Sequence, residues 1–155
     1  TPQSARFGEL DPPVDEWWPG MDRHDFMKGR KTSRIVWHKA HEIAGQKGHS
    51  IDAPVFAGQV SFVSGERGTY IGCENVGTTK DPEGFSGNVL ILLEDGSVST
   101  QTFEGRTEIR NGPDRFAGTG IWRMESGAGR FAGLRGSGPF RWSMIGDEYE
   151  EEFSG

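Results

Sequence analysis

The chain contains one cysteine, Cys73, and lacks long apolar runs. A single thiol excludes an internal disulfide framework and a zinc cluster built on cysteines. The longest strictly apolar run is VLILL at 89–93, far shorter than the roughly 20 residues that a membrane helix needs. No basic start followed by an apolar stretch is visible, although a removed signal peptide would leave no trace. A free thiol fits the cytoplasm, which is the location that we predict.

Basic residues are also scarce, with 17 Lys and Arg against 23 Asp and Glu and a net charge of −6. This acidic balance argues against nucleic acid as a partner, and we expect no membrane partner either. Glycine is abundant, at 24 of 155 residues, against an average usage of about 7%. With 33% hydrophobic and 26% charged residues, the chain is typical of one folded domain rather than a disordered segment.

The chain divides into two regions that differ in the periodicity of their hydrophobic residues. Residues 1–32 show no sustained helical or alternating period, so we expect an irregular N-terminal arm there. The arm contains Trp17 and Trp18, which either pack against the body or form a lid or a contact with a neighbouring subunit. Residues 33–155 read as short strands divided by glycine, and we expect them to form one β-barrel domain.

The strand pattern predicts an all-β fold without a long helix. Seven or eight strands at this spacing indicate an antiparallel barrel or sandwich, and closure into a barrel would remove exposed strand edges. Asp95-Gly96 lies between two strand-like runs and predicts a hairpin with a type I′ turn, which needs positive φ at both central residues. The expected strands are 33–44, 55–64, 69–78, 88–94, 97–106, 116–125 and 139–145, with the acidic tail at 147–152 as an eighth.

A glycine-rich segment at 126–136, SGAGRFAGLRG, stands before the last expected strands. It resembles a hairpin of the allene oxide cyclase and dirigent-protein superfamily, which has a glycine-rich turn, an aromatic, a small residue and another glycine there. The hairpin at 85–105, with its Asp95-Gly96 turn and Gln101, and the strand at 69–76, with Glu74, are similar to the preceding strands of that family. The resemblance covers residues 61–145, and it also fits small bacterial proteins of this superfamily that have no assigned function.

The resemblance implies an eight-stranded antiparallel calycin-like barrel with an apolar pocket at one end, assembled as a homodimer or homotrimer. Activities in the superfamily include cyclisation or isomerisation of reactive small molecules and stereocontrol without chemistry. The chain departs from the cyclases on its first strand, where no equivalent of their catalytic Glu and Asn is found. The plant substrate is therefore not carried over.

Alternation assigns the first expected strand two faces. Ile35, Trp37, Lys39 and His41 share the more apolar face, so we point it inward. Lys39 and His41 would then enter the cavity, where His transfers protons near pH 7 and a desolvated Lys becomes reactive. The alternative is that both belong to the outer wall or to the mouth of the barrel. A register error of one residue would bring in His38 and Glu42 instead.

The strand at 69–78 places Tyr70, Gly72 and Glu74 on one face. A carboxylate inside an apolar barrel loses water, which raises its pKa towards values useful for acid–base chemistry. Tyr70 can donate a hydrogen bond to a developing oxyanion. The alternative is that Glu74 pairs with an arginine in a structural bridge.

Trp122 lies on the face opposite Arg123 in its strand, and Phe140 and Trp142 oppose Arg141 in the next. The aromatic sets form either core or an aromatic pocket, since both use the same residue types. The two arginines are candidates for anchoring a carboxylate or phenolate, because guanidinium recognises planar anions; the alternative is that they are simply exposed.

Motif tests for other chemistry are negative. The chain has no Walker loop, no Gly-x-Ser-x-Gly elbow and no strand–helix context around its Gly-x-Gly pairs. We predict no cofactor and no metal site.

The favoured function is a cofactor-independent isomerase, cyclase or lyase that acts on a small, largely apolar molecule. His41, Tyr70 and Glu74 would move protons, Trp37 and Trp122 would enclose the substrate, and Lys39, Arg123 and Arg141 would help to bind it. The rivals are a non-catalytic barrel that binds or orients a small ligand, and an interaction protein with a filled barrel. A pocket with several titratable groups would favour the enzyme, and a wholly apolar pocket the binder.

Overall fold

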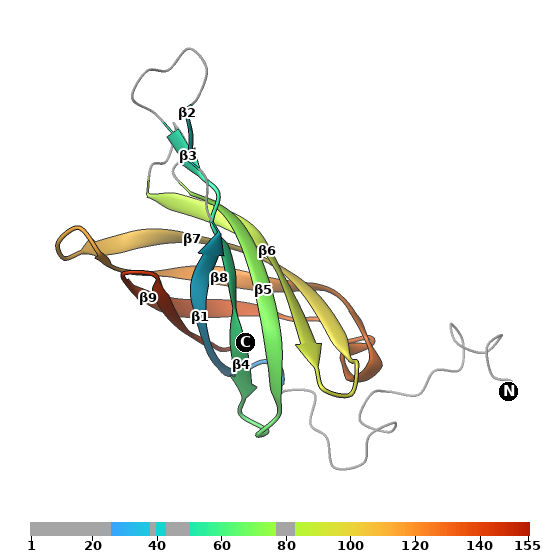
Figure 1. The fold of residues 1–155 in the computed structure, drawn as a ribbon. Helices are drawn as coiled ribbons and strands as arrows, with labels where there is room; N and C mark the ends of the chain where they lie inside the picture. The colour runs from blue at the N-terminus through green and yellow to red at the C-terminus, as the bar shows by residue number, and fades with distance from the viewer. Residues whose placement is uncertain (1–25, 38–39, 43–49, 77–82) are drawn as a thin grey trace, which may run out of the picture.

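The computed structural model describes residues 26–37, 40–42, 50–76 and 83–155 (Figure 1). Within these residues the fold is all-β, and the short 3-10 turn η3 lies at Gly129–Phe131. The strands are β1 (Gly29–Trp37), β2 (Ala40–Glu42), β3 (Ser50–Asp52), β4 (Val55–Phe62), β5 (Arg67–Val76), β6 (Gly84–Leu93), β7 (Val98–Arg110), β8 (Arg115–Ala128), β9 (Ser137–Ile145) and β10 (Glu148–Phe153).

Eight of these strands close into an antiparallel barrel, as the sequence predicted. The order around the barrel is β1, β4, β5, β6, β7, β8, β9 and β10, and β10 pairs with β1 to complete the ring. The short β2 and β3 pair with each other, and Asp52 of β3 pairs with Val76 of β5. Their hairpin projects from the end of the barrel where β5 finishes and β6 begins (Figure 1). We call this end the mouth end.

The opposite end is filled by apolar side chains. Phe26, just before β1, has no exposed surface, and the glycine-rich segment after β8 contributes Phe131 and Leu134, which are 0% and 1% exposed. The Phe26 ring lies 4.7 Å from that of Phe131 and 5.0 Å from that of Phe62, centroid to centroid. The glycine-rich segment at 126–136 therefore plugs this end of the barrel. We call it the plugged end.

The first strand differs from its prediction. β1 begins at Gly29 instead of residue 33, ends at Trp37, and is followed by the separate β2, so residues 33–44 do not form one strand. Ile35 pairs with Phe56, but the register shifts at the next position, where Trp37 pairs with Val55. Such a bulge turns the following side chain to the other face. Trp37 is consequently 55% exposed, and its predicted inward placement is wrong.

The β6–β7 turn lies where Asp95-Gly96 predicted it, but it is not type I′. The Gly96 N–H donates to the Leu93 carbonyl at 3.1 Å, and the Leu93 N–H donates to the Ser97 carbonyl at 2.9 Å. Gly96 has a φ of +90°. Among the described residues only glycines have positive φ, so the φ of Asp95 is negative and the turn does not meet the type I′ requirement. Asp95 instead accepts the Ser97 N–H on its carboxylate at 2.8 Å, an Asx interaction that stabilises the turn.

Candidate functional site

A cavity of about 30 Å³ lies inside the barrel, on the mouth side of the apolar plug. A space of this size holds one or two water molecules. Six polar or ionisable side chains from four of the barrel strands line it: Lys31, Tyr70, Glu74, Gln101, Tyr149 and Glu151. The remaining wall is Gly72 and apolar residues, namely Phe56, Val89, Phe103, Trp122 and Phe140.

A buried ion pair forms the deep wall of the cavity. Lys31 and Glu151 are directly opposite each other on β1 and β10 and are 4% and 8% exposed. Lys31 Nζ lies 3.3 Å from Glu151 Oε2. The Tyr149 hydroxyl donates to the other carboxylate oxygen, Oε1, at 2.6 Å. Pairing and hydrogen bonding are what make two buried charges tolerable, since isolated ones are very costly to desolvate.

The two tyrosines of the cavity are hydrogen-bond donors at neutral pH. Burial, the main cause, raises the pKa of the Tyr70 phenol far above its usual value; the neighbouring Ser33 hydroxyl opposes the shift, and the charges of Glu151 and Glu74 add to it. Burial likewise raises the pKa of Tyr149, followed by the charge of Glu151 and the hydrogen bond to it. Both phenols therefore keep their protons and neither acts as a base near pH 7.

Glu74 marks the way out of the cavity. Tyr70, Gly72 and Glu74 follow one another on the inner face of β5, with Tyr70 4% exposed and Glu74 half-buried. The other half-buried lining residues, Phe103 and Tyr149, lie at the same end, whereas Trp122 and Phe140, towards the plug, are each 2% exposed. The cavity thus opens towards the mouth end, with a carboxylate beside its opening.

Gly72 provides the space between Tyr70 and Glu74. A Cβ at this position would lie 3.6 Å from Val89 Cγ2 and 3.8 Å from the Asn88 carbonyl oxygen, which are ordinary contacts. Gly58, next to Tyr70 across the β4–β5 ladder, is different because a Cβ there would overlap the Thr32 carbonyl oxygen. Gly58 is thus required by close packing, whereas at Gly72 the missing side chain is part of the cavity.

Five aromatic rings continue around the barrel above the polar groups. Successive ring centroids are 5.2, 6.1, 5.4 and 6.1 Å apart, in tilted, stacked and edge-on contacts that suit aromatic pairs. We call this set the aromatic collar; in order it comprises Phe56, Tyr149, Trp142, Phe85 and Phe103. A ligand that approaches from the mouth end meets these apolar surfaces before it reaches the ion pair.

Of the residues that sequence reasoning selected, three come together here: Tyr70, Glu74 and Trp122 all line the cavity. His41 lies on β2, in the hairpin that is not one of the eight barrel strands, and Lys39 lies outside the described residues.

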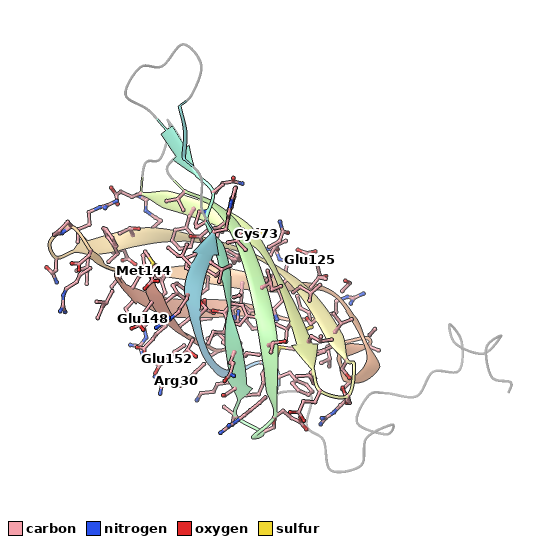
Figure 2. All side chains as sticks on the ribbon, viewed as in Figure 1. Arg30, Cys73, Glu125, Met144, Glu148 and Glu152 are labelled. Carbon is pink, nitrogen blue, oxygen red and sulfur yellow. The ribbon has the colours of Figure 1, made fainter. Side chains whose placement is uncertain are left out.

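The two candidate arginines lie on the outer surface of the barrel. Arg123 is exposed, and Arg141, with 77% of its side chain exposed, pairs with Glu152 at 2.9 Å. Arg30, Glu148 and Glu152 also lie on this outer face (Figure 2). The outer wall therefore separates both arginines from any ligand inside the barrel.

Sequence reasoning missed Lys31, Gln101, Tyr149 and Glu151 as site residues. The sequence pattern starts the first strand at residue 33, which leaves Lys31 in the irregular arm, whereas β1 begins at Gly29. Extending the alternation of Ile35 and Ser33 by one step would have placed Lys31 inward. The same alternation in the tail, with Tyr149 and Phe153 inward, would have identified Glu151.

In the part of the chain that the structure describes, no group of three or more His, Cys, Asp or Glu side chains lies together as a metal-ligand set would. No helix in the same residues has the length and apolar character required to cross a membrane.

Comparisons with known proteins do not extend this picture. The chain matches no protein-family model, and neither the curated proteins nor the solved structures contain a significant match to it.

Proposed function

We propose that the barrel cavity is an acid–base active site, and that the protein is a cofactor-independent isomerase, cyclase or lyase for a small, largely apolar molecule. The observation that carries the proposal is the convergence of Lys31, Tyr70, Glu74, Tyr149 and Glu151 on one cavity inside an otherwise apolar barrel. Burying this many ionisable groups is costly, and such clusters gather preferentially at functional sites.

The side chains divide into a base and a set of donors. Glu74, a half-buried carboxylate at the opening, is placed to take a proton from a substrate carbon and to return it to another position. Tyr70 keeps its proton and can donate a hydrogen bond to an oxygen that gains negative charge. A positioned proton-transfer group typically contributes about 10²–10⁴ in rate. The Lys31–Glu151 pair supplies a fixed positive end close to the Tyr70 ring, 5.6 Å from Nζ to the ring centroid.

The size of the cavity limits what enters it. Sites for drug-sized ligands enclose about 300–1,000 Å³, whereas this cavity encloses about 30 Å³. Only the reacting group of the substrate therefore reaches the polar side chains. Its apolar remainder lies against the aromatic collar.

A second candidate is a non-catalytic barrel that binds or orients a small ligand. The observation in its favour is that half of the lining residues are apolar or glycine, and that the collar adds further aromatic surface. The resemblance to the allene oxide cyclase and dirigent superfamily, which rests on the sequence motifs alone, is compatible with both candidates.

Deuterium exchange tests the catalytic proposal directly. Small enolisable ketones, cyclopentanone and cyclohex-2-enone, are incubated with the protein in D₂O, and loss of the α-proton signals is followed by NMR. We expect the wild type to accelerate exchange and Glu74→Gln to lose at least ~10² of that rate, the low end for acid–base catalysis. Glu125→Gln is the matched control, because Glu125 is exposed on the outer wall and bonded to Thr102.

The melting temperature of each variant is measured on the same preparation. A Glu74→Gln protein that folds normally and exchanges as fast as the wild type removes Glu74 from the mechanism. Loss of stability with full activity per folded molecule would instead indicate a structural bridge. Failure of the wild type to accelerate exchange of either ketone would contradict acid–base catalysis on carbonyl substrates and favour the binding candidate.

A further inference from the structure

Two buried atoms of the cavity lining, Tyr70 Oη and Glu151 Oε2, have no hydrogen bond of acceptable geometry among the described residues, and neither has Ser33 Oγ beside Tyr70. Glu151 Oε2 has its ion pair with Lys31, at 3.3 Å, as its remaining contact. Tyr70, Glu151 and Ser33 are 4%, 8% and 7% exposed. The Ser33 hydroxyl is close enough to lower the Tyr70 pKa in part, yet the two hydroxyls do not form a bond of acceptable geometry. Buried polar groups are almost always satisfied, so these atoms point to a bound group that satisfies them.

The chemical types of the three atoms define that group. A carboxylate oxygen only accepts hydrogen bonds, whereas each hydroxyl both donates and accepts. The complementary group must therefore donate to Glu151 Oε2 and accept from Tyr70, the hydroxyl that lines the cavity. An alcohol hydroxyl does both with one oxygen atom.

Charge at the deep end favours a neutral group over an ion. Lys31 and Glu151 cancel each other at 3.3 Å, so a bound cation or anion would add an unpaired charge at a buried site. A hydroxyl adds none. Gly72 leaves room for the adjoining carbon atoms, because a Cβ at that position would be in ordinary contact with Val89 at 3.6 Å.

We infer that the cavity recognises a small neutral alcohol, with its hydroxyl between Tyr70 and Glu151 and its first carbon atoms over Gly72. This inference rests on the proposed function in one respect, namely that the cavity receives a ligand. It goes further in naming the functional group that the deep end selects. Gly72 becomes the residue that sets how much carbon is admitted beside that group.

Three probes of one chain length test the selection. Propan-1-ol, propylamine and sodium propionate at pH 7 present a neutral, a cationic and an anionic end, and backbone amide shifts in NMR spectra report binding. We expect propan-1-ol to bind at least ~10-fold more tightly than either ion, the difference expected for one buried hydrogen bond or charge. The shifts should concentrate at residues that line the cavity.

Substitutions then locate the hydroxyl and the carbon chain. Tyr70→Phe should weaken propan-1-ol binding at least ~10-fold and leave the two ions unchanged. Gly72→Val should abolish binding of all three probes. If the valine side chain disturbs folding, Gly72→Ala is the substitute, and it should weaken binding. Cys73→Ser is the control, because Cys73 is exposed on the outer face of the same strand and should have no effect (Figure 2).

Equal or tighter binding of an ion overturns the inference but leaves the cavity as a ligand site, so the proposed function stands. Unchanged alcohol affinity in folded Tyr70→Phe overturns it as well. Absence of binding for all three probes contradicts the inference by itself, whereas the fate of acid–base catalysis is decided separately by the deuterium exchange assay.

Discussion

Lys31 Nζ lies 3.3 Å from Glu151 Oε2 inside the barrel, and the two side chains are only 5% and 8% exposed. Lys31→Met should leave a buried carboxylate without its cation and lower the free energy of unfolding by about 3–5 kcal/mol. Lys31→Met combined with Glu151→Leu should recover most of that loss, because no charge remains buried. Urea unfolding of the two single variants and the double variant measures the coupling.

An exposed pair on the same two strands is the control for this cycle. Arg34 and Glu148 are 3.0 Å apart with 67% and 63% of their side chains exposed. Arg34→Met should change the free energy of unfolding by less than about 1 kcal/mol. Equal effects at Lys31 and Arg34 would contradict the buried position of the inner pair.

The two cavity tyrosines should respond oppositely to loss of the hydroxyl. Tyr149→Phe removes the donor that bonds Glu151 Oε1 at 2.6 Å and should cost about 1.5–3 kcal/mol, as for hydrogen bonds to charged groups. Tyr70→Phe removes a hydroxyl that has no suitable partner among the described residues, so the melting temperature should stay the same or rise. Thermal unfolding of both variants decides, and a larger loss for Tyr70→Phe would show that its hydroxyl is bonded within the protein.

Two inner-wall glycines that differ only in their neighbours provide a packing test. Gly58→Ala would force the new methyl into the Thr32 carbonyl oxygen and should destabilise the barrel by about 1–3 kcal/mol. Gly72→Ala meets only ordinary contacts, and replacing glycine inside a strand should be neutral or stabilising by up to about 1 kcal/mol. Urea unfolding measures the free energy of unfolding of both variants. Equal destabilisation by the two substitutions would indicate that the space beside Gly72 is already filled.

The β6–β7 turn depends on the left-handed backbone of Gly96. A side chain there would find open space, so any penalty comes from its φ of +90° alone. Gly96→Val should lower the melting temperature, because β-branched residues resist positive φ. Gly96→Asn, which tolerates this conformation better, should lose less. An unchanged melting temperature for Gly96→Val would mean that the turn can adopt another geometry at no cost.

We also propose that the protein assembles as a dimer or trimer. The outer face of β5 and β6 carries Ile71, Leu90 and Leu92, which are 52%, 43% and 44% exposed and give this wall an apolar character unlike the charged β1–β10 wall. Light scattering at micromolar concentration checks this. A particle of 17 kDa, the mass of one chain, would contradict the expectation.

The strand faces and the position of the β6–β7 turn follow from residues that are close together in the sequence. The alternation of Tyr70, Gly72 and Glu74 is a period-two pattern, and one inward residue is enough to orient its neighbours on the same strand. Asp95-Gly96 located a turn because glycine is strongly favoured where φ must be positive, although the turn type depended on the bond from Ser97 to Asp95. These features need only interactions between residues close in the chain.

The content of the cavity was decided by tertiary structure. Lys31 and Glu151 are 120 positions apart, and they meet only because β10 returns to pair with β1 and closes the barrel. A single bulge after Ile35 turned Trp37 outward, although its alternation with Ile35 predicted the reverse. Local pattern therefore determined which residues lie in strands, whereas ring closure and register, which depend on strands distant in sequence, determined which polar groups share the interior.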